Sequence, residues 1–485
     1  MTPAVSPSIE TSSGASLPAW ARAIARPATE FPLTPLEILE GAIPDGLRGS
    51  LYRNGPGRLQ RGDRRVNHWF DGDGAVLGVH FTNAGAAGVY RYVRSAGYQD
   101  EEAANQFLYS GYGTLAPGPI WQRWQAQFKN AANTSVLALP DRLLTLWEGG
   151  QPHHLDLHTL ETHGLDDLGA LTPTCTYSAH PKRGAEGDIY NFGIVASANA
   201  TLNLYRSDPR GKILQRADIP LNGLPLIHDF VLAGAYLVFC VPPVRMNALP
   251  AVLGFSSFSD ALMWQPKHGT QIVVVERESF EVVSWGETDP WFQWHFGRGY
   301  QDFDGSLVFD VARYPDFTIN QFLAEVATGS IKTQAPGQLW QIRLNPQTGK
   351  ILEEQVLIDR QCEFPIVSAR PIDADLAPTY LSLQSHRDRP FTELYNAIGQ
   401  YNPATAELTI ANAGEQVYPS EPIAVRDRND ADREWILSVV YDGVAHQSQV
   451  WIYDGDRLSD GAVCRIALPS VIPHSFHGTW RSQAD

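Results

Sequence analysis

Short apolar runs separated by turn residues are the feature that most constrains how this chain can fold. They alternate between apolar and polar residues, or are rich in β-branched and aromatic side chains, as strands are. Examples are residues 50–53, 76–81, 143–147, 189–195, 236–241, 271–275, 306–311 and 435–441. The 41 glycines and 34 prolines supply the turns that so many short strands require. We therefore predict an all-β fold.

Several of these runs are predicted to pair as hairpins. Residues 339–344 and 351–357 flank a turn that ends at Gly349, and residues 396–400 and 408–411 flank another turn. Strand, turn and returning strand, repeated over most of the chain, favour a β-propeller. An array of β-sandwiches is the alternative, but no low-complexity linker divides the chain.

One propeller domain is predicted over residues 31–485. Residues 1–30 are expected to be a flexible lead with a short amphipathic segment near Trp20. Two later segments interrupt the strand pattern, an amphipathic stretch at 120–128 and an apolar loop or helix at 251–264. From the residues alone, the favoured interpretation is a cap that buries its apolar sides on one face of the propeller. The alternative is an exposed patch that enters one leaflet of a membrane.

Composition excludes several classes of function. A formal net charge of −16 argues against binding nucleic acid, or an anionic membrane through a basic patch, because both require a positive surface. The N-terminal residues do not resemble a secretory signal and no apolar run is long enough to span a bilayer, so a cytoplasmic location is expected. The four isolated cysteines are expected to be buried free thiols.

Four of the 14 histidines stand in unusual contexts at apparent strand ends. They are His180 in Ser-Ala-His-Pro, His228 in Ile-His-Asp-Phe, His295 in Trp-His-Phe and His477 in Phe-His-Gly-Thr. Strand ends in a propeller converge on the central axis, where separate blades can each supply one ligand. Neutral imidazole suits Fe, Cu, Ni or Zn and leaves the metal its full positive charge. If the fold brings the four together, the chain is a metalloenzyme.

A second group of histidines is not predicted to bind a metal. His153, His154, His158 and His163 lie in a polar stretch that resembles a surface turn. Short histidine tracts can bind metals, but here this is the weaker alternative.

Three glutamates stand among apolar or small neighbours: Glu148, Glu363 and Glu421. A buried carboxylate is costly unless it is paired. A metal-bound imidazole usually donates its other ring N–H to such a group, which fixes the tautomer. The three glutamates are therefore predicted to hold ligand histidines, and the alternative is that they are turn or strand-edge acids that face water.

Several motifs, taken together, resemble the carotenoid cleavage oxygenases. They are Tyr-Arg-Asn-Gly-Pro at 52–56, Phe-Asp-Gly-Asp-Gly at 70–74, Ala-Asn-Thr at 132–134, Leu-Trp-Glu-Gly-Gly at 146–150, Ile-His-Asp-Phe at 227–230, Pro-Gly-Gln-Leu-Trp at 336–340, Glu-Phe-Pro at 363–365 and His-Gly-Thr-Trp at 477–480. The resemblance runs from about residue 30 to the C-terminus. It is greatest to the prokaryotic branch of the family, which forms retinal.

The resemblance implies a seven-bladed propeller with Fe(II) on its axis and a cap of helices and loops over the active-site face. It implies that the iron is held by His180, His228, His295 and His477. It also implies that three of those imidazoles are held in turn by Glu148, Glu363 and Glu421.

The resemblance also implies a tunnel and a membrane patch. The tunnel would be lined by Phe70, Thr134, Trp147, Trp294 and Phe364, with the Thr134 methyl group beside an open iron position. Trp294 and Leu226 stand where that branch has phenylalanine, which bears on tunnel width and bond choice. The patch would comprise Trp121, Trp124, Phe128, Phe255, Phe258 and Trp264, so peripheral membrane contact becomes the expected role of these segments.

The activity implied is that of a non-haem Fe(II) dioxygenase. It would use O₂ to cleave the central 15,15′ double bond of an apocarotenoid, a lipophilic polyene, and give retinal-type aldehydes. The alternatives are cleavage of full-length carotenoids at an eccentric bond, stilbene-type cleavage, and a propeller that only binds partners. Stilbene cleavers tend to carry a lysine just before the first of the glutamates, where this chain has Trp147.

Overall fold

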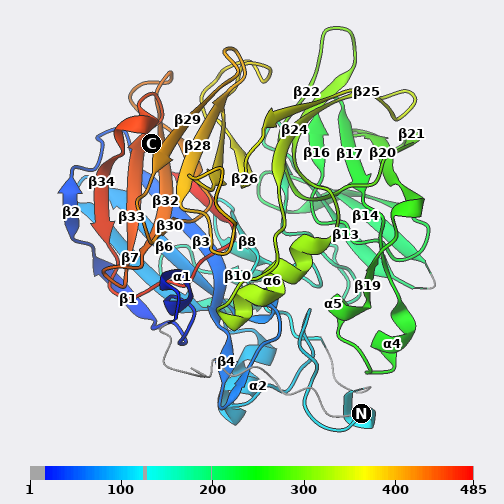
Figure 1. The fold of residues 1–485 in the computed structure, drawn as a ribbon, viewed down its shortest axis with the longest axis horizontal. Coiled ribbons are helices and arrows are strands. Elements are labelled where there is room, and N and C mark those ends of the chain that lie inside the picture. The colour runs from blue at the N-terminus through cyan, green and yellow to red at the C-terminus, as the bar shows by residue number, and fades with distance from the viewer. Residues whose placement is uncertain (1–16, 124–127, 198, 484–485) are drawn as a thin grey trace.

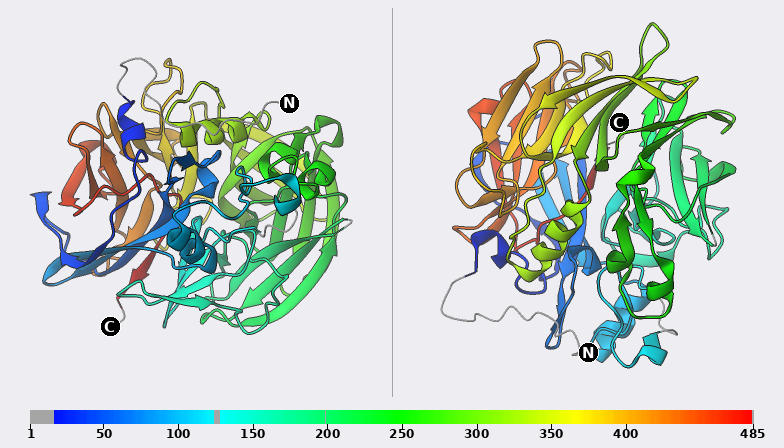
Figure 2. Two further views of the ribbon diagram at one scale, coloured as in Figure 1. Left: turned by 90° about the horizontal axis from the view of Figure 1, so that it is seen from below. Right: turned by 45° about the vertical axis from the view of Figure 1, so that its right-hand side comes forward.

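Seven antiparallel sheets are arranged around a central axis (Figure 1). The structure is a computed structural model that describes residues 17–123, 128–197 and 199–483. Seen from below, the chain passes round the ring from blue through green to red (Figure 2). The predicted all-β, seven-bladed propeller is thereby confirmed.

Five blades consist of strands that follow one another along the chain, each blade starting at the axis. Blade 2 contains β8 (Ser135–Ala138), β9 (Leu143–Leu146), β10 (His153–Leu155) and β11 (Thr162–Leu165). Blade 3 contains β12 (Lys182–Arg183), β13 (Ile189–Ala196), β14 (Ala200–Ser207) and β15 (Ile213–Pro220). Blade 4 contains β16 (Val231–Ala233), β17 (Tyr236–Val241), β20 (Thr270–Glu276) and β21 (Val282–Thr288).

Blades 5 and 6 contain the two hairpins predicted from the sequence. Blade 5 contains β22 (Phe292–Gln301), β23 (Leu307–Tyr314), β24 (Gln338–Asn345) and β25 (Lys350–Ile358). Blade 6 contains β26 (Cys362–Val367), β27 (Thr379–Leu383), β28 (Ala397–Asn402) and β29 (Glu407–Asn412). The pairs β24–β25 and β28–β29 confirm the hairpins.

The other two blades combine strands from both ends of the chain. Blade 1 contains β35 (Gly478–Ser482), β3 (Gly49–Arg58), β6 (Asp73–Thr82), β7 (Gly85–Tyr92) and β1 (Phe31–Pro35). Blade 7 contains β30 (Val417–Pro419), β31 (Ile423–Arg426), β32 (Glu434–Asp442), β33 (Gln447–Asp454), β34 (Ala462–Ala467) and β2 (Ile38–Gly41). The last strand completes the first blade and an early strand completes the last, so backbone hydrogen bonds close the ring twice.

The hydrophobic core lies between neighbouring blades. Leu77 of β6, Leu437 of β32 and Ile452 of β33 belong to one fully buried cluster between blades 1 and 7. Burying each such side chain contributes roughly 1.5–3 kcal/mol. Since the middle strands pack on both faces, they are apolar almost throughout instead of strictly alternating. The four cysteines are buried and unpaired, as predicted.

Most of the helices lie in the lower half of the ring as drawn (Figure 1). They are α1 (Ala19–Arg22), α2 (Ala96–Ala104), α3 (Ile120–Arg123), α4 (Ala248–Val252), α5 (Phe258–Ala261) and α6 (Thr318–Thr328), with the 3-10 turn η1 (Trp69–Asp71). Short strand pairs accompany them, β4 (Gln60–Arg61) with β5 (Arg64–Arg65) and β18 (Val244–Met246) with β19 (Leu262–Trp264). Two further 3-10 turns are η2 (Pro266–His268) and η3 (Leu458–Asp460).

Two of these helices pack into one aromatic cluster. Helix α6 buries Ile319, Phe322 and Val326, which are spaced at helical intervals along one face. Helix α1 inserts Trp20 into the same cluster, and the carbonyl oxygen of Trp20 accepts a hydrogen bond from Nε2 of His474 at 2.9 Å. The predicted lead begins in residues 1–16, which lie outside the described residues. Among the described helices, none is both long and apolar enough to cross a bilayer.

Candidate active site

The innermost strands of all seven blades bring a polar residue to the axis. Most of these strands contact their neighbours around the ring, and each residue lies at or near the start of its strand. In chain order they are Thr134 before β8, His180 before β12, His228 before β16, His295 in β22, Glu363 in β26, Glu421 between β30 and β31, and His477 before β35. The propeller therefore places residues up to 343 positions apart in sequence, from Thr134 to His477, at one end of one axis.

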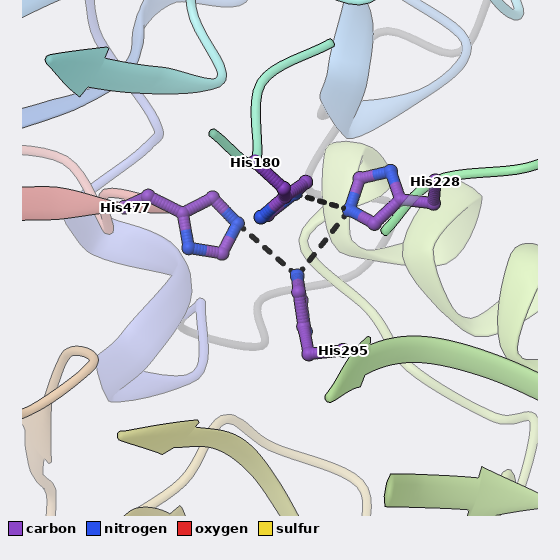
Figure 3. A group of neighbouring side chains, drawn as sticks. All are labelled: His180, His228, His295 and His477. Atoms are coloured by element: carbon purple, nitrogen blue, oxygen red, sulfur yellow. Dashed lines mark hydrogen bonds between the residues drawn. The ribbon is translucent and has the colours of Figure 1, made fainter. Parts of the chain in front are cut away.

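The four predicted histidines meet there with their Nε2 atoms pointing toward a common centre (Figure 3). The Nε2 atom of His228 lies 2.9 Å from that of His180 and 3.3 Å from that of His295, and His295 Nε2 lies 3.1 Å from His477 Nε2. One ligand nitrogen from each ring lies within 4.8 Å of all the others. Nitrogens about 2.1 Å from one metal ion stand about 3.0 Å apart when neighbouring bonds are perpendicular. The spacing matches one ion bound by four imidazoles.

Glutamate carboxylates contact three of the four rings at Nδ1, the ring nitrogen that points away from the common centre. Nδ1 of His295 donates to Oε2 of Glu363 at 2.6 Å, and Nδ1 of His477 donates to Oε1 of Glu421 at 2.8 Å. Nδ1 of His228 contacts Oε1 of Glu148. His180 has no carboxylate contact within the described part of the chain. The structure thus pairs each predicted glutamate with a different histidine.

This pattern fixes which nitrogens are free to bind a cation. When Nδ1 carries the hydrogen that a carboxylate accepts, Nε2 presents a lone pair. Lone pairs that converge at about 3 Å repel one another unless a cation lies between them. The donor set therefore fits a metal ion, and the neutral nitrogens suit a first-row transition metal better than Mg²⁺ or Ca²⁺, which prefer oxygen.

The surroundings oppose charge on two of these rings and favour it on a third. Burial lowers the pKa of His180 far below its ordinary value, and the neighbouring ligand imidazoles lower it further. Burial also lowers the pKa of His477, more than Glu421 raises it. For His295, burial alone would lower the pKa, but Glu363 outweighs that effect and raises it. Imidazoles kept neutral are ready to bind a metal without first losing a proton.

The glutamates themselves have partners that sequence reasoning missed. Arg53 Nη1 donates to Oε2 of Glu421 at 2.8 Å, and the backbone N–H of Gly478 donates to the same oxygen at 2.9 Å. Burial alone would raise the pKa of Glu421, but His477 and Arg53 outweigh it and hold that pKa below its usual value. On the other side, the Tyr314 hydroxyl donates to Oε1 of Glu363 at 3.2 Å. Arg53 lies in the Tyr-Arg-Asn-Gly-Pro motif at 52–56. Its place in that motif was the only feature of the sequence that could have marked it as a residue of the site.

Three of the predicted tunnel aromatics lie against the histidines or one another. The Trp294 ring lies edge-on to His228, with centroids 4.7 Å apart, and 5.5 Å from Phe70. The Phe364 ring stacks on His295 at 5.1 Å. These rings form an apolar wall beside the four histidines, an environment that suits an apolar ligand.

The other two predicted tunnel residues have different surroundings. Thr134 lies next to His477, whose backbone N–H donates to the Thr134 carbonyl at 3.3 Å, and the Thr134 hydroxyl donates to Oδ1 of Asn133 at 3.2 Å. The Trp147 ring lies over Gly149, where an added Cβ would come within 2.4 Å of it. A contact of either residue with the substrate path stays a prediction.

Backbone irregularities set the direction of these side chains. The pairing register shifts near His295 in β22 and near Phe364 in β26, as it does at β-bulges. Phe364 has φ of +57°, a left-handed conformation that a bulky residue rarely adopts, and its N–H donates to Oε2 of Glu363 at 2.5 Å. Strain of this kind persists only where the surrounding structure holds it in place. Here it directs the Phe364 ring onto the histidines.

The residues of the predicted membrane patch fall into three groups. Trp121 is 63% exposed, Phe255 is 67% exposed and Phe128 is also exposed. Phe258 and Trp264 are half-buried, and Phe258 packs on Phe128 with ring centroids 6.5 Å apart. Trp124 lies outside the described residues.

The exposed residues lie on two segments that contact each other. Arg123 Nη1 donates to the carbonyl oxygen of Gly254 at 3.5 Å, which joins the α3 segment to the α4 segment. Leu249 and Val252 of α4 are exposed as well. We call Trp121, Phe128, Leu249, Val252 and Phe255 the apolar patch.

Known proteins resemble this chain in fold, and they resemble its sequence over most of its length. Residues 24–482 match the protein family described as Retinal pigment epithelial membrane protein. The chain is 31% identical over 460 residues to Apocarotenoid-15,15′-oxygenase of Synechocystis sp., covering 92% of each chain. It is 26% identical over 476 residues to Resveratrol cleavage oxygenase 1 of Aspergillus fumigatus, covering 93% of each. The crystal structure of the cobalt-substituted Synechocystis apocarotenoid oxygenase has a TM-score of 0.86 at 30% identity, over 96% of this chain and 98% of that one.

These matches span nearly the whole propeller. The four histidines and the three glutamates all lie within the matched residues. The interpretation as a propeller that only binds partners is therefore wrong. The chain belongs to the Retinal pigment epithelial membrane protein family of carotenoid cleavage oxygenases and is an enzyme of that family.

Proposed function

We propose that this chain is a non-haem Fe(II) dioxygenase that cleaves the central 15,15′ double bond of an apocarotenoid. The observation that carries the proposal is the convergence of four Nε2 atoms, each within 4.8 Å of the others, with three of the rings contacted at Nδ1 by Glu148, Glu363 and Glu421. The 31% identity to Apocarotenoid-15,15′-oxygenase supports the choice of substrate and bond.

Iron is favoured over other metals by the composition of the site. His180, His228, His295 and His477 supply four neutral nitrogens, which leave a divalent ion its full charge and two of six octahedral positions free. A structural zinc site would be closed by four ligands. When bound, a ferrous ion supplies the redox chemistry that lets O₂ react with an alkene.

The reaction balances without an acid, a base or a reductant from the protein. One C=C bond breaks and two C=O bonds form, and each product takes one atom of O₂. The protein therefore has to position the polyene and exclude water. The buried Trp294 ring and the half-buried Phe364 ring lie beside the histidines and suit both tasks, because an apolar chain can be oriented only by shape and by contacts at its ends.

Stilbene-type cleavage is the neighbouring activity within the family. The relative from Aspergillus fumigatus is named Resveratrol cleavage oxygenase 1. Trp147 stands where stilbene cleavers tend to carry lysine, and an indole over Gly149 offers no cation to a phenolate. We therefore propose the polyene substrate instead.

The test is to incubate the iron-loaded enzyme under ¹⁸O₂ with three candidate substrates in separate reactions: β-apo-8′-carotenal, β-carotene and resveratrol. Mass spectrometry then identifies the aldehydes. We expect retinal from β-apo-8′-carotenal, with one ¹⁸O in each product once exchange with water is controlled. A different cleaved bond, or turnover of resveratrol alone, would overturn the proposal.

We also propose that the enzyme collects its substrate from a membrane surface. The apolar patch brings large exposed side chains from α3 and α4 together, and such clusters mark interaction sites. Phe258 of the neighbouring α5 packs between the patch residue Phe128 and Tyr112, and Tyr112 contacts Phe70 at 5.3 Å. A line of aromatic contacts thus joins the patch to the rings beside the metal centre, which a lipophilic substrate would favour.

A further inference from the structure

His180 differs from the other three ligand histidines, because no carboxylate contacts its ring within the described part of the chain. Its backbone N–H donates to Oγ of Ser178 at 3.2 Å. The next residue is Pro181, whose ring fixes φ, so Lys182 follows His180 over a short and stiff link. A contact that fixes Lys182 therefore also restrains the backbone of His180.

The Lys182 ammonium contacts a buried carboxylate from the segment that leads into blade 4. Nζ of Lys182 lies 2.8 Å from Oδ1 of Asp229, whose side chain is 1% exposed. Asp229 directly follows His228, so this ion pair joins the segments that carry two of the ligands. Lys182 is only partly exposed, and its ammonium lies 5.9 Å from the centre of the Phe230 ring.

The same carboxylate also contacts a third ligand segment. Oδ2 of Asp229 accepts the backbone N–H of Phe296 at 3.0 Å, and Phe296 directly follows His295. Oδ1 accepts the backbone N–H of Phe230 at 2.8 Å. A buried carboxylate is costly unless it is paired, and the Lys182 ammonium supplies the opposite charge. One side chain thus connects the segments of blades 3, 4 and 5 that carry three of the four histidines.

We infer that Lys182 and Asp229 are positioning residues that hold His180 in place for the metal ion. This inference rests on the metal site of the proposed function, but not on its substrate or on the bond that is cleaved. The three glutamates contact the other ligand rings directly at Nδ1. The ion pair restrains His180 through the backbone instead, from two residues further along the chain.

Position and charge make opposite predictions for removal of the ammonium. A cation near a bound metal ion repels it, and an unpaired Asp229 carboxylate would attract it. If charge alone mattered, removing the Lys182 ammonium would therefore tighten metal binding. If the ion pair positions His180, removing it frees the ligand segment and weakens metal binding. The direction of the change in affinity separates the two effects.

Arg142 provides a matched control away from the metal centre. Its Nε lies 2.6 Å from Oδ2 of Asp166, and both side chains are partly buried. Arg142 lies between β8 and β9, and Asp166 directly follows β11, the last strand of blade 2. Neither residue adjoins a ligand histidine in the sequence. Arg142→Met therefore reports the general cost of removing a partly buried ion pair.

The experiment loads wild type, Lys182→Met, Asp229→Asn and Arg142→Met with Co²⁺ alone, without substrate. Competition with a chelator gives Kd for Co²⁺. X-ray absorption at the cobalt K edge, at saturating Co²⁺, counts the imidazole nitrogens around the metal. Both are read without turnover, so they test the inference even if the enzyme cleaves another bond or another substrate.

Lys182→Met and Asp229→Asn should bind Co²⁺ about tenfold more weakly than wild type, as expected for residues that orient metal ligands. At saturation they should show fewer imidazole nitrogens per metal than wild type, and Arg142→Met should match wild type in both measurements. If Asp229→Asn does not fold, Lys182→Met decides the test, because Lys182 is partly exposed and its loss leaves both backbone hydrogen bonds to Asp229 in place.

Unchanged or tighter Co²⁺ binding in Lys182→Met would overturn the inference and leave the proposed function standing. An equal loss of affinity in Arg142→Met would also overturn it, because the effect would then be one of general stability. Wild type that binds no Co²⁺ through imidazoles would overturn the metal site itself, and this inference with it.

Discussion

Arg53 donates a hydrogen bond from Nη1 to Oε2 of Glu421 at 2.8 Å, and the two side chains are 1% and 4% exposed. Oε1 of the same carboxylate accepts from His477, which is adjacent to the closing strand β35. Arg53 also donates from Nη2 to the carbonyl oxygen of Phe476 at 2.9 Å. One buried cation therefore joins strand β3, the closing segment and the carboxylate that holds a candidate ligand.

Removing that cation should destabilise the fold strongly. In Arg53→Met, Glu421 stays buried with fewer donors, and breaking a buried ion pair costs about 3–5 kcal/mol. Arg343→Met is the control, because its ion pairs with Asp302 and Asp304 are partly exposed and should contribute about 0–1 kcal/mol. Urea unfolding measures both. Equal losses in the two variants would show that the Arg53 pair has no special role.

Glu363→Gln should weaken metal binding more than folding. Both oxygens of Glu363 accept hydrogen bonds, from His295 and Phe364 at Oε2 and from Tyr314 at Oε1. Glutamine directs an N–H₂ group at one of these donors and no longer fixes the His295 tautomer, so metal affinity or turnover should fall about 10–100-fold. Metal analysis and kcat measure this, with the more exposed Glu354→Gln as control. Unchanged metal content and rate would make Glu363 a structural residue only.

His68 should make the protein sensitive to acid. Its Nδ1 accepts from the Phe70 N–H at 3.1 Å and its Nε2 donates to the Asn320 carbonyl at 3.3 Å, so only the neutral ring satisfies both contacts. Burial lowers the pKa of His68 to about 3. The unfolded imidazole takes up a proton below about pH 6.5. Its contribution to stability is therefore complete above that pH and is lost as the pH falls toward 3, by about 1.4 kcal/mol per pH unit.

The variant His68→Asn tests this directly, because asparagine retains an acceptor for the Phe70 N–H but does not titrate. The free energy of unfolding of wild type should fall faster with acid than that of the variant. His153 and His474 are also buried, with pKa values lowered to about 4, so the difference between the two proteins is the quantity to compare. Parallel pH profiles would exclude His68 as the cause.

Polar substitutions in the apolar patch should release the enzyme from membranes. Trp121→Ser and Phe255→Ser remove exposed aromatic area, so co-sedimentation with neutral phosphatidylcholine vesicles should fall by about tenfold or more. Changing the half-buried Phe258 or Trp264 should affect stability as well. Phe303→Ser is the control, because Phe303 is fully exposed in the β22–β23 turn, far from α4 in Figure 1. Equal loss of binding in the control would argue against a localised patch.

The sequence predicted the propeller and its axial residues for identifiable reasons. The strands alternate or are uniformly apolar, and the histidine and glutamate motifs are specific to one family. Arg53 was not recognised as a partner of Glu421, because nothing local marks a contact with a residue 368 positions away. The left-handed φ of Phe364 depends on a bulge that the Glu-Phe-Pro motif does not reveal.

Other features were missed although a signal was present. Helix α6 carries Ile319, Phe322 and Val326 at helical spacing, a pattern visible before the structure. The exchange of strands between the two ends of the chain could not be predicted from the sequence. Short strands such as β2 and β35 contain no sequence pattern that identifies the strands they pair with. The ion pair of Lys182 with Asp229 joins the segments of two blades and emerged only from the structure.

The central claim is that four histidines bind one iron ion. X-ray absorption at the iron K edge, on anaerobically loaded wild type and His228→Ala with metal content measured in parallel, tests it most directly. We expect one iron per chain in wild type with about four imidazole nitrogens at about 2.1 Å, and loss of iron in the variant. Iron surrounded mainly by oxygen atoms in wild type, or an unchanged spectrum in His228→Ala, would contradict the account.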